Sequence, residues 1–323
     1  MKDPIFICGH RKSGTTLLHN LFDDHPDLLV YPIDLNLLYA YFPIYNTDQY
    51  SDTQRIDRLK KILFRDLEVQ LANENISGVI DIIGFENLFF ARLNGADLND
   101  MKKIITALLE SYGETMGRLG KTPLVKETSI ELYLNDIIQW FPNSKFIHLV
   151  RDPRDNFAAL KSGVQEHYSL LGEDEKQTLA SLIFRTRQGL EMGKLNLDYL
   201  GAKSYKFINF SKLVANPHEV MIELSEFLTI EFLDSLIIPS RLGRASKGNN
   251  FDGNKFKGIS AENTNRWRER ISVFEAKIIE FHLGKLMQDF GYSLEYNRLE
   301  SAEFASEFYK WENYKYFFSD RFN

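Results

Sequence analysis

Short apolar runs alternate along the chain with longer stretches that repeat with the period of a helix. The apolar runs occupy residues 5–8, 124–127, 146–150 and 206–210, and each ends at a polar or charged turn. Helical patterns follow them, as in residues 15–24, where the leucines fall on one helical face. Strands that alternate with helices predict an α/β fold, with a mainly parallel sheet flanked by helices.

Residues 35–120 break this alternation. They contain long helical patterns, such as MKKIITALLESYGETM at 101–116, and an aromatic segment, LLYAYFPIY at 37–45. We interpret the stretch as a helical insertion after the first strand–helix unit. This position predicts that the insertion covers the ligand site and forms its acceptor side.

Residues 300–323 are unusually aromatic. Nine of these 24 residues carry an aromatic ring: Phe304, Phe308, Tyr309, Trp311, Tyr314, Tyr316, Phe317, Phe318 and Phe322. So apolar a segment predicts a C-terminal helix or tail packed on its own domain, residues 1–299, or on the second subunit of a homodimer. Its few basic residues make a membrane-surface role less favoured.

Composition narrows the class of protein. The chain has 323 residues, 44% hydrophobic and 26% charged, as in ordinary globular proteins. The first strand begins close to Met1, which predicts a cytoplasmic protein without a signal peptide or membrane span. Cys8 is the only cysteine and lies in an apolar strand, so it is expected to be buried and no intrachain disulfide can form. The seven histidines follow no metal-binding pattern, so no metal site is expected.

Charge is unevenly distributed. The formal net charge of −6 argues against a nucleic-acid-binding protein, which usually has a basic excess. Residues 241–270, however, contain eight basic and three acidic side chains. Two interpretations remain for this basic segment: an anion-binding loop, or a solvated surface loop.

Residues 9–16, GHRKSGTT, lie between the first apolar run and the first helical pattern. They keep the glycine spacing of a phosphate-binding loop, G-x-x-x-x-G-K-[ST], but Thr15 stands where that motif has its lysine. A lysine occurs three residues earlier, at Lys12. Backbone N–H groups and hydroxyls in such a loop can still form an anion cradle at the start of the helix.

The motifs together resemble the sulfotransferases that use 3′-phosphoadenosine 5′-phosphosulfate (PAPS). KSGTT at 12–16 looks like their 5′-phosphosulfate loop, and FIHLVRDPRDNFAAL at 146–160 is similar to their 3′-phosphate signature. Order and spacing are closest to the bacterial, carbohydrate and tyrosylprotein branch. The resemblance implies a P-loop-type fold and sulfuryl transfer from PAPS to a hydroxyl or amine, with no metal. It implies a small-molecule or carbohydrate acceptor.

The resemblance also assigns donor-binding residues. They are Arg11, Lys12, Ser13, Gly14, Thr15 and Thr16 in the loop, Arg151 after a strand, and Asn249, Lys255 and Lys257 in the basic segment. The family has a serine eight residues after the arginine, where this chain has Ala159, and Ser162 one turn later is the proposed substitute. Arg151 could instead form a structural ion pair with Asp152 or Asp155.

Three residues are predicted to be catalytic. Lys12 and Lys126 would stabilise charge on the sulfuryl group, although Lys126 could instead pair with Glu127. Asp34 would be the general base, or else would cap the helix that begins after it. Four histidines are alternative candidates for the base: His10, His19, His148 and His167.

Two other functions remain open at this point. One is a P-loop kinase or nucleotide hydrolase with a displaced lysine, which the sequence RDPRD at 151–155 disfavours. The other is a nucleotide-binding protein of the same fold that has lost turnover, which Ala159 makes conceivable.

Overall fold

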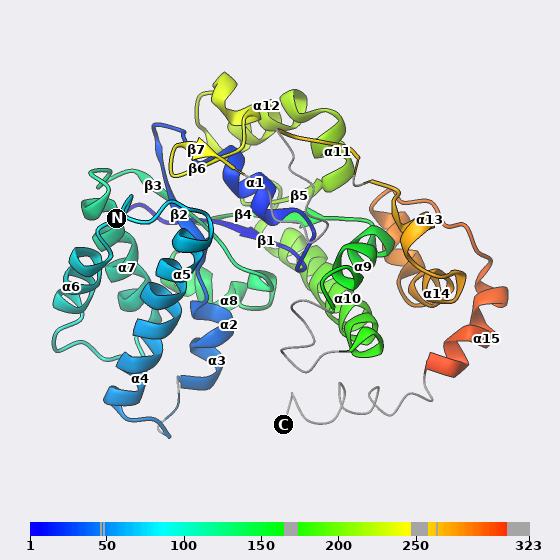
Figure 1. Ribbon diagram of the computed structural model, residues 1–323, viewed down its shortest axis with the longest axis horizontal. Coiled ribbons are helices and arrows are strands. Elements are labelled where there is room, and N and C mark those ends of the chain that lie inside the picture. Colours follow the sequence, from blue (N-terminus) through cyan, green and yellow to red (C-terminus); the bar gives the residue numbers. More distant parts are fainter. Residues whose placement is uncertain (46, 48, 165–173, 247–257, 263, 309–323) are drawn as a thin grey trace.

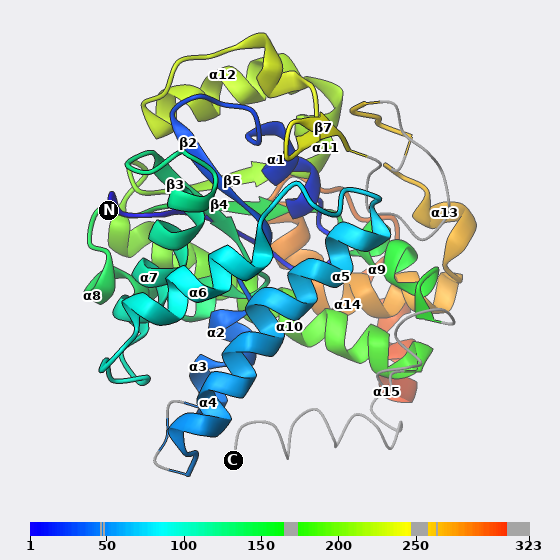
Figure 2. The ribbon, with the colours of Figure 1, turned by 60° about the vertical axis from the view of Figure 1, so that its left-hand side comes forward.

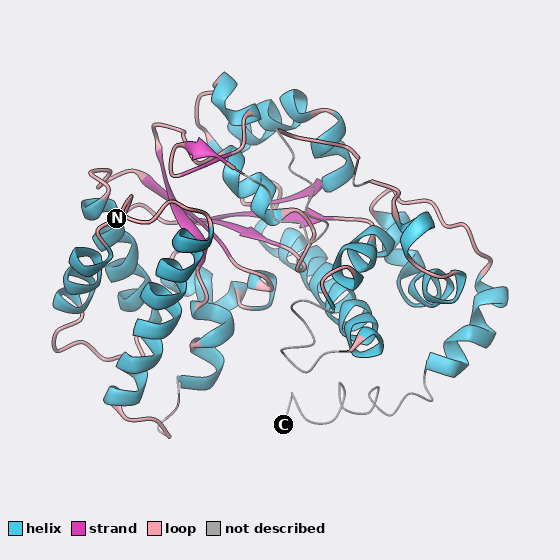
Figure 3. Cartoon of the chain, viewed as in Figure 1, coloured by secondary structure: helices cyan, strands magenta, loops and turns pink. Residues whose placement is uncertain are grey.

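The computed structural model contains a five-stranded parallel sheet with helices on both faces (Figures 1 and 3). It describes the whole chain except residues 46, 48, 165–173, 247–257, 263 and 309–323. The strands are β1 (Ile5–Cys8), β2 (Leu28–Asp34), β3 (Thr122–Lys126), β4 (Lys145–Val150) and β5 (Tyr205–Asn209). Their order in the sheet is β2-β3-β1-β4-β5. The predicted α/β fold is therefore confirmed.

Alternate residues of the strands face opposite layers. Ile5 and Ile7 pack on one face against α1 (Thr15–Leu21), α11 (Phe210–Ala215) and α12 (Pro217–Leu228). Phe6 and Cys8 point into the core on the other face. Figure 2 shows α1, α11 and α12 above the sheet, with the long α10 (Glu175–Leu200) below it. Because both faces are covered, the strands read as continuous apolar runs.

The helical insertion follows β2 and lies beside the sheet (Figure 1). Its elements are α2 (Leu37–Ala40), α3 (Phe42–Tyr45), α4 (Asp52–Leu59), the π-helix η1 (Lys60–Arg65), α5 (Asp66–Asn73), α6 (Ile82–Arg92) and α7 (Met101–Thr115). Their apolar side chains form one core with the Phe6 and Cys8 face of the sheet. A short 3-10 helix, η2 (Ile130–Leu132), and α8 (Leu134–Trp140) come after β3 and complete this layer.

Strand β2 was not predicted from the sequence. Its segment, LLVYPID, contains Pro32, which lacks the N–H that a central strand would donate. The structure places β2 at the edge of the sheet, where a proline is tolerated. The Arg241 guanidinium donates to the Pro32 carbonyl oxygen at 2.5 and 2.9 Å and forms an ion pair with Glu74. This arginine of the basic segment therefore has a structural partner.

The C-terminal part forms a helical layer beyond β4 and β5. It contains α9 (Pro153–Lys161), α10, α13 (Trp267–Arg270), α14 (Val273–Asp289) and α15 (Arg298–Phe308). The 3-10 helix η5 (Asp234–Ile237) and the hairpin β6 (Ser240–Arg241) and β7 (Arg244–Ala245) connect α12 to this layer.

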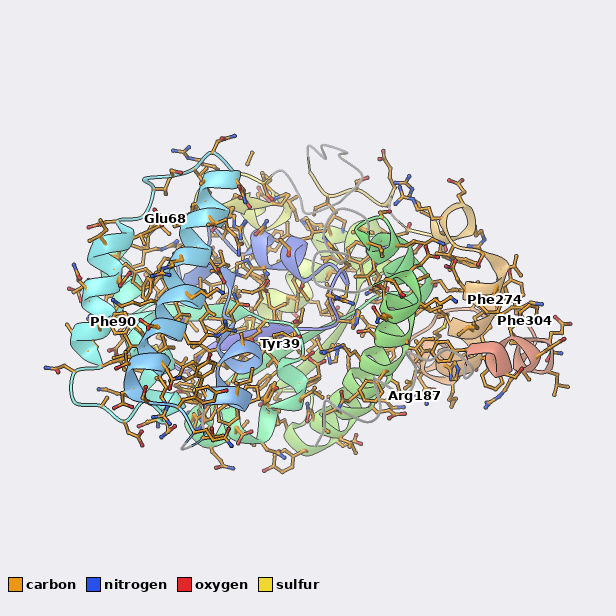
Figure 4. The ribbon with its side chains drawn as sticks, turned by 60° about the horizontal axis from the view of Figure 1, so that its bottom comes forward. Tyr39, Glu68, Phe90, Arg187, Phe274 and Phe304 are labelled. Atoms are coloured by element: carbon orange, nitrogen blue, oxygen red, sulfur yellow. The ribbon has the colours of Figure 1, made fainter. Side chains whose placement is uncertain are left out.

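The beginning of the aromatic C-terminal segment is helical. Phe308 is buried in the core that α15 shares with α14, and Phe304 meets the Phe274 ring edge-on (Figure 4). The remaining aromatic residues of the segment lie outside the described residues. Among the helices that the structure describes, none is long and apolar enough to cross a membrane.

Candidate active site at the carboxyl edge of the sheet

The loop between β1 and α1 is fixed by its glycines. Gly9 has φ 137° and Gly14 has φ 101°, values that L side chains rarely adopt. A side-chain carbon at Gly14 would lie 2.3 Å from the Phe210 ring, and one at Gly9 would lie 2.5 Å from the Leu149 carbonyl oxygen. Lys12, with φ 63°, also adopts a left-handed conformation. The loop therefore requires glycine at both ends and holds Lys12 in a strained turn.

Strand register brings Asp34 and Lys126 together at this edge. Lys126 pairs in register with Ile7 of β1 and with Asp34 of β2. The Lys126 ammonium forms an ion pair with the Asp34 carboxylate. The Lys126 side chain is 5% exposed, whereas that of Asp34 is 42% exposed. The alternative pairing of Lys126 with Glu127 is therefore wrong, and Asp34 presents its carboxylate at the surface of the site.

Lys12 and Arg151 lie at the same edge. Arg151 Nη1 donates to the Lys12 carbonyl oxygen at 2.8 Å, so the arginine supports the loop from β4. Burial, together with the nearby charges of Arg151 and Lys126, lowers the pKa of Lys12 to about 8. Three cations therefore share one space, an arrangement that favours a bound anion.

The hydroxyls of the loop are available to such an anion. Ser13 is 1% exposed, and its Oγ has no hydrogen-bond partner among the described residues. Thr15, the first residue of α1, is also buried, and Thr16 is half-buried. A buried hydroxyl without a partner is costly unless a ligand satisfies it. The assignment of these residues to the 5′-phosphosulfate of PAPS stays a prediction from the sequence resemblance.

The helix after Asp34 is capped by a different residue. Asn36 is the N-cap of α2 and makes no side-chain cap bond. Instead, the Glu127 carboxylate accepts the backbone N–H groups of Leu38 and Tyr39 at 3.2 and 2.5 Å. The capping role considered for Asp34 is therefore wrong. Burial raises the pKa of Glu127 to about 8, with the Asp34 charge acting in the same direction.

The RDPRD signature, residues 151–155, contains one arginine at the candidate site and a second arginine that is buried in the core. Asp152 caps α9 and pairs with Arg154 at 2.6 Å, and Arg154 also pairs with Glu280 of α14 at 2.6 Å. Asp155 accepts the backbone N–H groups of Asn265 and Trp267 at 2.7 and 3.0 Å. Both aspartates proposed as ion-pair partners of Arg151 are thus engaged elsewhere by short bonds.

The 3′-phosphate side of the site is only partly described. Ser162 Oγ donates to the Ala158 carbonyl oxygen at 3.2 Å and accepts from Arg270 Nη1 at 3.4 Å. The Arg270 charge in turn acts on Arg151. Asn249, Lys255 and Lys257 lie outside the described residues, so their assignment stays a prediction. Arg270 belongs to the basic segment 241–270, although the sequence did not assign it as an individual donor ligand.

Three of the four candidate histidines, His10, His19 and His148, lie among the described residues and are poor general bases. His19 and His148 are 1% exposed, and burial lowers the pKa of both to about 3. Burial and the charges of Arg11 and Arg185 lower the pKa of His10 to about 3. His10 Nδ1 donates to the Arg11 carbonyl oxygen at 2.9 Å, a bond within the loop itself. His167 lies outside the described residues.

One buried polar cluster was missed by the sequence analysis. Cys8, Glu131 and His148 come from three separate elements, and their ligand-type atoms lie within 4.8 Å of one another. The Tyr205 hydroxyl lies 2.7 Å from His148 Nδ1. Burial raises the pKa of Glu131 to about 7 and that of the Cys8 thiol well above its usual value. Near neutral pH the Cys8 thiol and the His148 imidazole are therefore uncharged, and the Glu131 carboxyl is near the midpoint of its titration. Only the fold brings the three side chains together.

A parallel sheet with a glycine-bounded loop and cations at its carboxyl edge is typical of P-loop-type folds, in which such loops bind phosphate groups. Within that class, the chain belongs to the sulfotransferase family. Residues 4–234 match the family model described as "Sulfotransferase family", and this match covers well over half of the chain.

Individual relatives support this membership. The protein-tyrosine sulfotransferase of Drosophila melanogaster is 22% identical over 237 residues, covering 72% of this chain and 39% of the relative. The omega-hydroxy-beta-dihydromenaquinone-9 sulfotransferase Stf3 of Mycobacterium bovis is 27% identical over 166 residues, covering 46% of this chain and 42% of the relative. The match thus spans about two fifths of these curated relatives.

Solved structures define the same fold. The sulfotransferase domain of the curacin biosynthetic pathway has a TM-score of 0.61 and 19% identity, covering 91% of this chain and 99% of the domain. The sulfotransferase domain of the Synechococcus PCC 7002 olefin synthase also has a TM-score of 0.61, with 21% identity and coverage of 91% and 98%.

Proposed function

We propose that this protein transfers a sulfuryl group from PAPS to a hydroxyl acceptor and releases adenosine 3′,5′-bisphosphate. The observation that carries the proposal is the meeting of Lys12, Lys126 and Asp34 at the carboxyl edge of the sheet, beside the glycine-bounded loop. Family membership sets the reaction class, and this arrangement supplies cations for the transferring group and a carboxylate for the acceptor proton.

Lys12, Lys126 and Asp34 have different roles in an in-line displacement at sulfur. The acceptor oxygen forms a bond to sulfur while the bond between sulfur and the bridging oxygen of the donor breaks, and the electron pair leaves on the 5′-phosphate. Lys12 and Lys126 stabilise the negative charge that grows on this phosphate and on the sulfuryl oxygens. The proton of the acceptor hydroxyl passes to the Asp34 carboxylate.

Donor binding is assigned to two anion sites. Ser13, Gly14, Thr15 and Thr16 take the 5′-phosphosulfate, supported by the unpartnered Ser13 hydroxyl. Arg151 takes the 3′-phosphate, with Ser162 and Arg270 beside it. Arg11, together with Asn249, Lys255 and Lys257 of the late loop, completes this assignment on the basis of the family resemblance.

The acceptor is a hydroxyl compound in this proposal. The names of the two curated relatives specify a tyrosine and an omega-hydroxy compound, and both carry a hydroxyl group. The helical insertion supplies the acceptor side, because α2 begins three residues after Asp34 and Tyr39 of α2 is 47% exposed.

The test combines donor binding with turnover. Calorimetry is expected to show that adenosine 3′,5′-bisphosphate binds more tightly than AMP or ATP and does so without added Mg²⁺. A screen of hydroxyl metabolites with PAPS, read by mass spectrometry, is expected to yield sulfated products. Equal affinity for AMP, or binding that depends on Mg²⁺, would favour the kinase alternative. Tight bisphosphate binding without any product would favour the non-catalytic one.

A further inference from the structure

A pocket opens between the loop and helix α10. Its empty space, open solvent at the mouth included, is about 310 Å³. The lining includes Ser13 and Arg151 from the donor side and Arg185, Thr186 and Gly189 from α10. One hollow therefore connects the predicted donor site with a helix that the sequence analysis did not connect with function.

Arg185 is the cation on the α10 side of this pocket. Its guanidinium carbon lies over the Tyr39 ring of the insertion, 5.7 Å from the ring centroid. Tyr39, labelled in Figure 4, belongs to α2 of the insertion. Arg185 is half-buried, and among the residues that the structure describes it has neither a hydrogen bond nor an ion pair. A half-buried guanidinium without an acceptor is expected to bind one from a ligand.

The groups around Arg185 favour a ligand that carries a single negative charge. Glu131 is the acidic group that interacts with Arg185, and burial keeps its pKa raised, at about 7. Arg185 also acts on His10, which is uncharged at neutral pH. Thr186 Oγ1 is buried in the same lining without a hydrogen-bond partner. Arg151 lines the donor side of the pocket, whereas the α10 side offers the Arg185 guanidinium and the Thr186 hydroxyl with the Glu131 carboxyl group nearby. This α10 side suits a monoanion better than a doubly charged phosphate.

We propose that Arg185, beneath the Tyr39 ring, binds a carboxylate of the acceptor, so that the substrate class is a hydroxy acid. The inference rests on the proposed function, since it adds a second contact to the acceptor of that reaction. Tyr39 connects the two contacts: its ring lies against Arg185, and its backbone N–H binds Glu127, the neighbour of Lys126 in sequence. The hydroxyl of the acceptor meets Asp34 while its carboxylate meets Arg185.

The test measures binding rather than turnover. Probes are decanoate and 4-phenylbutyrate, each compared with its uncharged primary amide, added to protein saturated with adenosine 3′,5′-bisphosphate and followed by calorimetry. In the wild-type protein at least one carboxylate should bind roughly tenfold or more tightly than its amide, the size expected of charge-assisted hydrogen bonds. Arg185→Gln should abolish this preference, and Arg185→Lys should keep part of it.

Arg187→Gln is the matched control, because Arg187 lies on the same helix, is exposed and donates to the His282 carbonyl oxygen instead (Figure 4). This variant should keep the full preference for carboxylates. Wild-type protein that binds each carboxylate no better than its amide, including no binding of either, would overturn the proposal. So would a preference that survives in Arg185→Gln.

Bisphosphate binding separates this inference from the proposed function. If wild-type protein fails to bind adenosine 3′,5′-bisphosphate, the proposed function fails. If wild-type protein binds it and only Arg185→Gln loses this affinity, Arg185 is a donor ligand and the acceptor subsite is refuted. Circular dichroism of each variant, compared with wild type, establishes that a lost preference comes from the side chain and not from unfolding.

Discussion

The ion pair between Lys126 and Asp34 gives two predicted catalytic residues a shared structural constraint. Lys126 is buried at the end of β3, so its charge depends on the Asp34 carboxylate for compensation. Asp34 is more exposed and can meet a ligand while remaining near the lysine. Substitutions at these positions therefore affect charge balance and chemistry together, and variants must be chosen to separate them.

Lys12 is the residue whose removal should affect turnover most selectively. Its side chain lies in a loop rather than in the apolar core, so Lys12→Ala should fold normally. Loss of one charge stabiliser is expected to lower kcat by about 10²–10³-fold. Steady-state assays and thermal melts, with the exposed Lys203→Ala as control, provide the check. Near-normal kcat in folded Lys12→Ala would exclude this lysine from the mechanism.

Asp34 can be tested with three substitutions. Asp34→Asn keeps an oxygen for the Lys126 ammonium but cannot take a proton, so kcat should fall roughly 10²-fold or more with little change in melting temperature. Asp34→Ala should also lose about 1–2 kcal/mol of stability, because Lys126 loses its partner. Asp34→Glu should recover part of the rate. A fully active Asp34→Asn enzyme would rule out Asp34 as the base.

At the scale of elements, Glu127 joins β3 to the insertion. Its carboxylate holds the first turn of α2, next in sequence to the lysine that faces the loop. The pKa of Glu127 is raised to about 8 in the folded protein against an ordinary value of 4.5. The stability that it contributes is therefore complete below about pH 4.5 and is lost as the pH rises through 8.

Glu127→Gln should remove this pH dependence while keeping an oxygen for the N–H groups of α2. We expect the loss of melting temperature between pH 5 and pH 9 to be smaller in the variant than in the wild type. Glu68→Gln, a change at an exposed position of α5 (Figure 4), is the control and should leave the wild-type profile unchanged. Identical pH profiles for Glu127→Gln and wild type would contradict the raised pKa.

The sequence predicted the elements that carry a local pattern. Four strands were visible as apolar runs, and the loop was visible from its glycines. Strand β2 was not predicted because it contains Pro32. The register that pairs Asp34 with Lys126 therefore could not be predicted either. The capping of α2 by Glu127 and the contact of Arg185 with Tyr39 join segments that are distant in sequence. The spacing of residues along the chain therefore does not predict them.

At the scale of the whole molecule, Arg154 ties the sheet layer to the C-terminal helices. It is 3% exposed, pairs with Asp152 and Glu280, donates to the Ser293 carbonyl oxygen at 2.9 Å and lies 4.3 Å from the centroid of the Trp267 ring. The same five-residue signature thus contains one arginine for the site and one for the core.

The two arginines should respond in opposite ways to substitution. Arg154→Ala leaves two buried carboxylates without their partner and should cost about 3–5 kcal/mol of stability, measured by urea denaturation. Arg151→Ala should cost much less stability but weaken the binding of adenosine 3′,5′-bisphosphate by roughly tenfold or more, measured by calorimetry. The assignment of roles would be reversed if Arg154→Ala stayed stable and Arg151→Ala unfolded.

The covered edge of β2 bears on how copies of the protein behave at high concentration. An exposed strand edge can template the addition of further strands and so start aggregation. In β2, Pro32 has no N–H to offer an incoming strand, and Arg241, fixed by Glu74, occupies its carbonyl oxygen. These two features oppose the addition of a further strand at this edge. Pro32, which makes β2 hard to predict from the sequence, thus protects the folded sheet from strand addition.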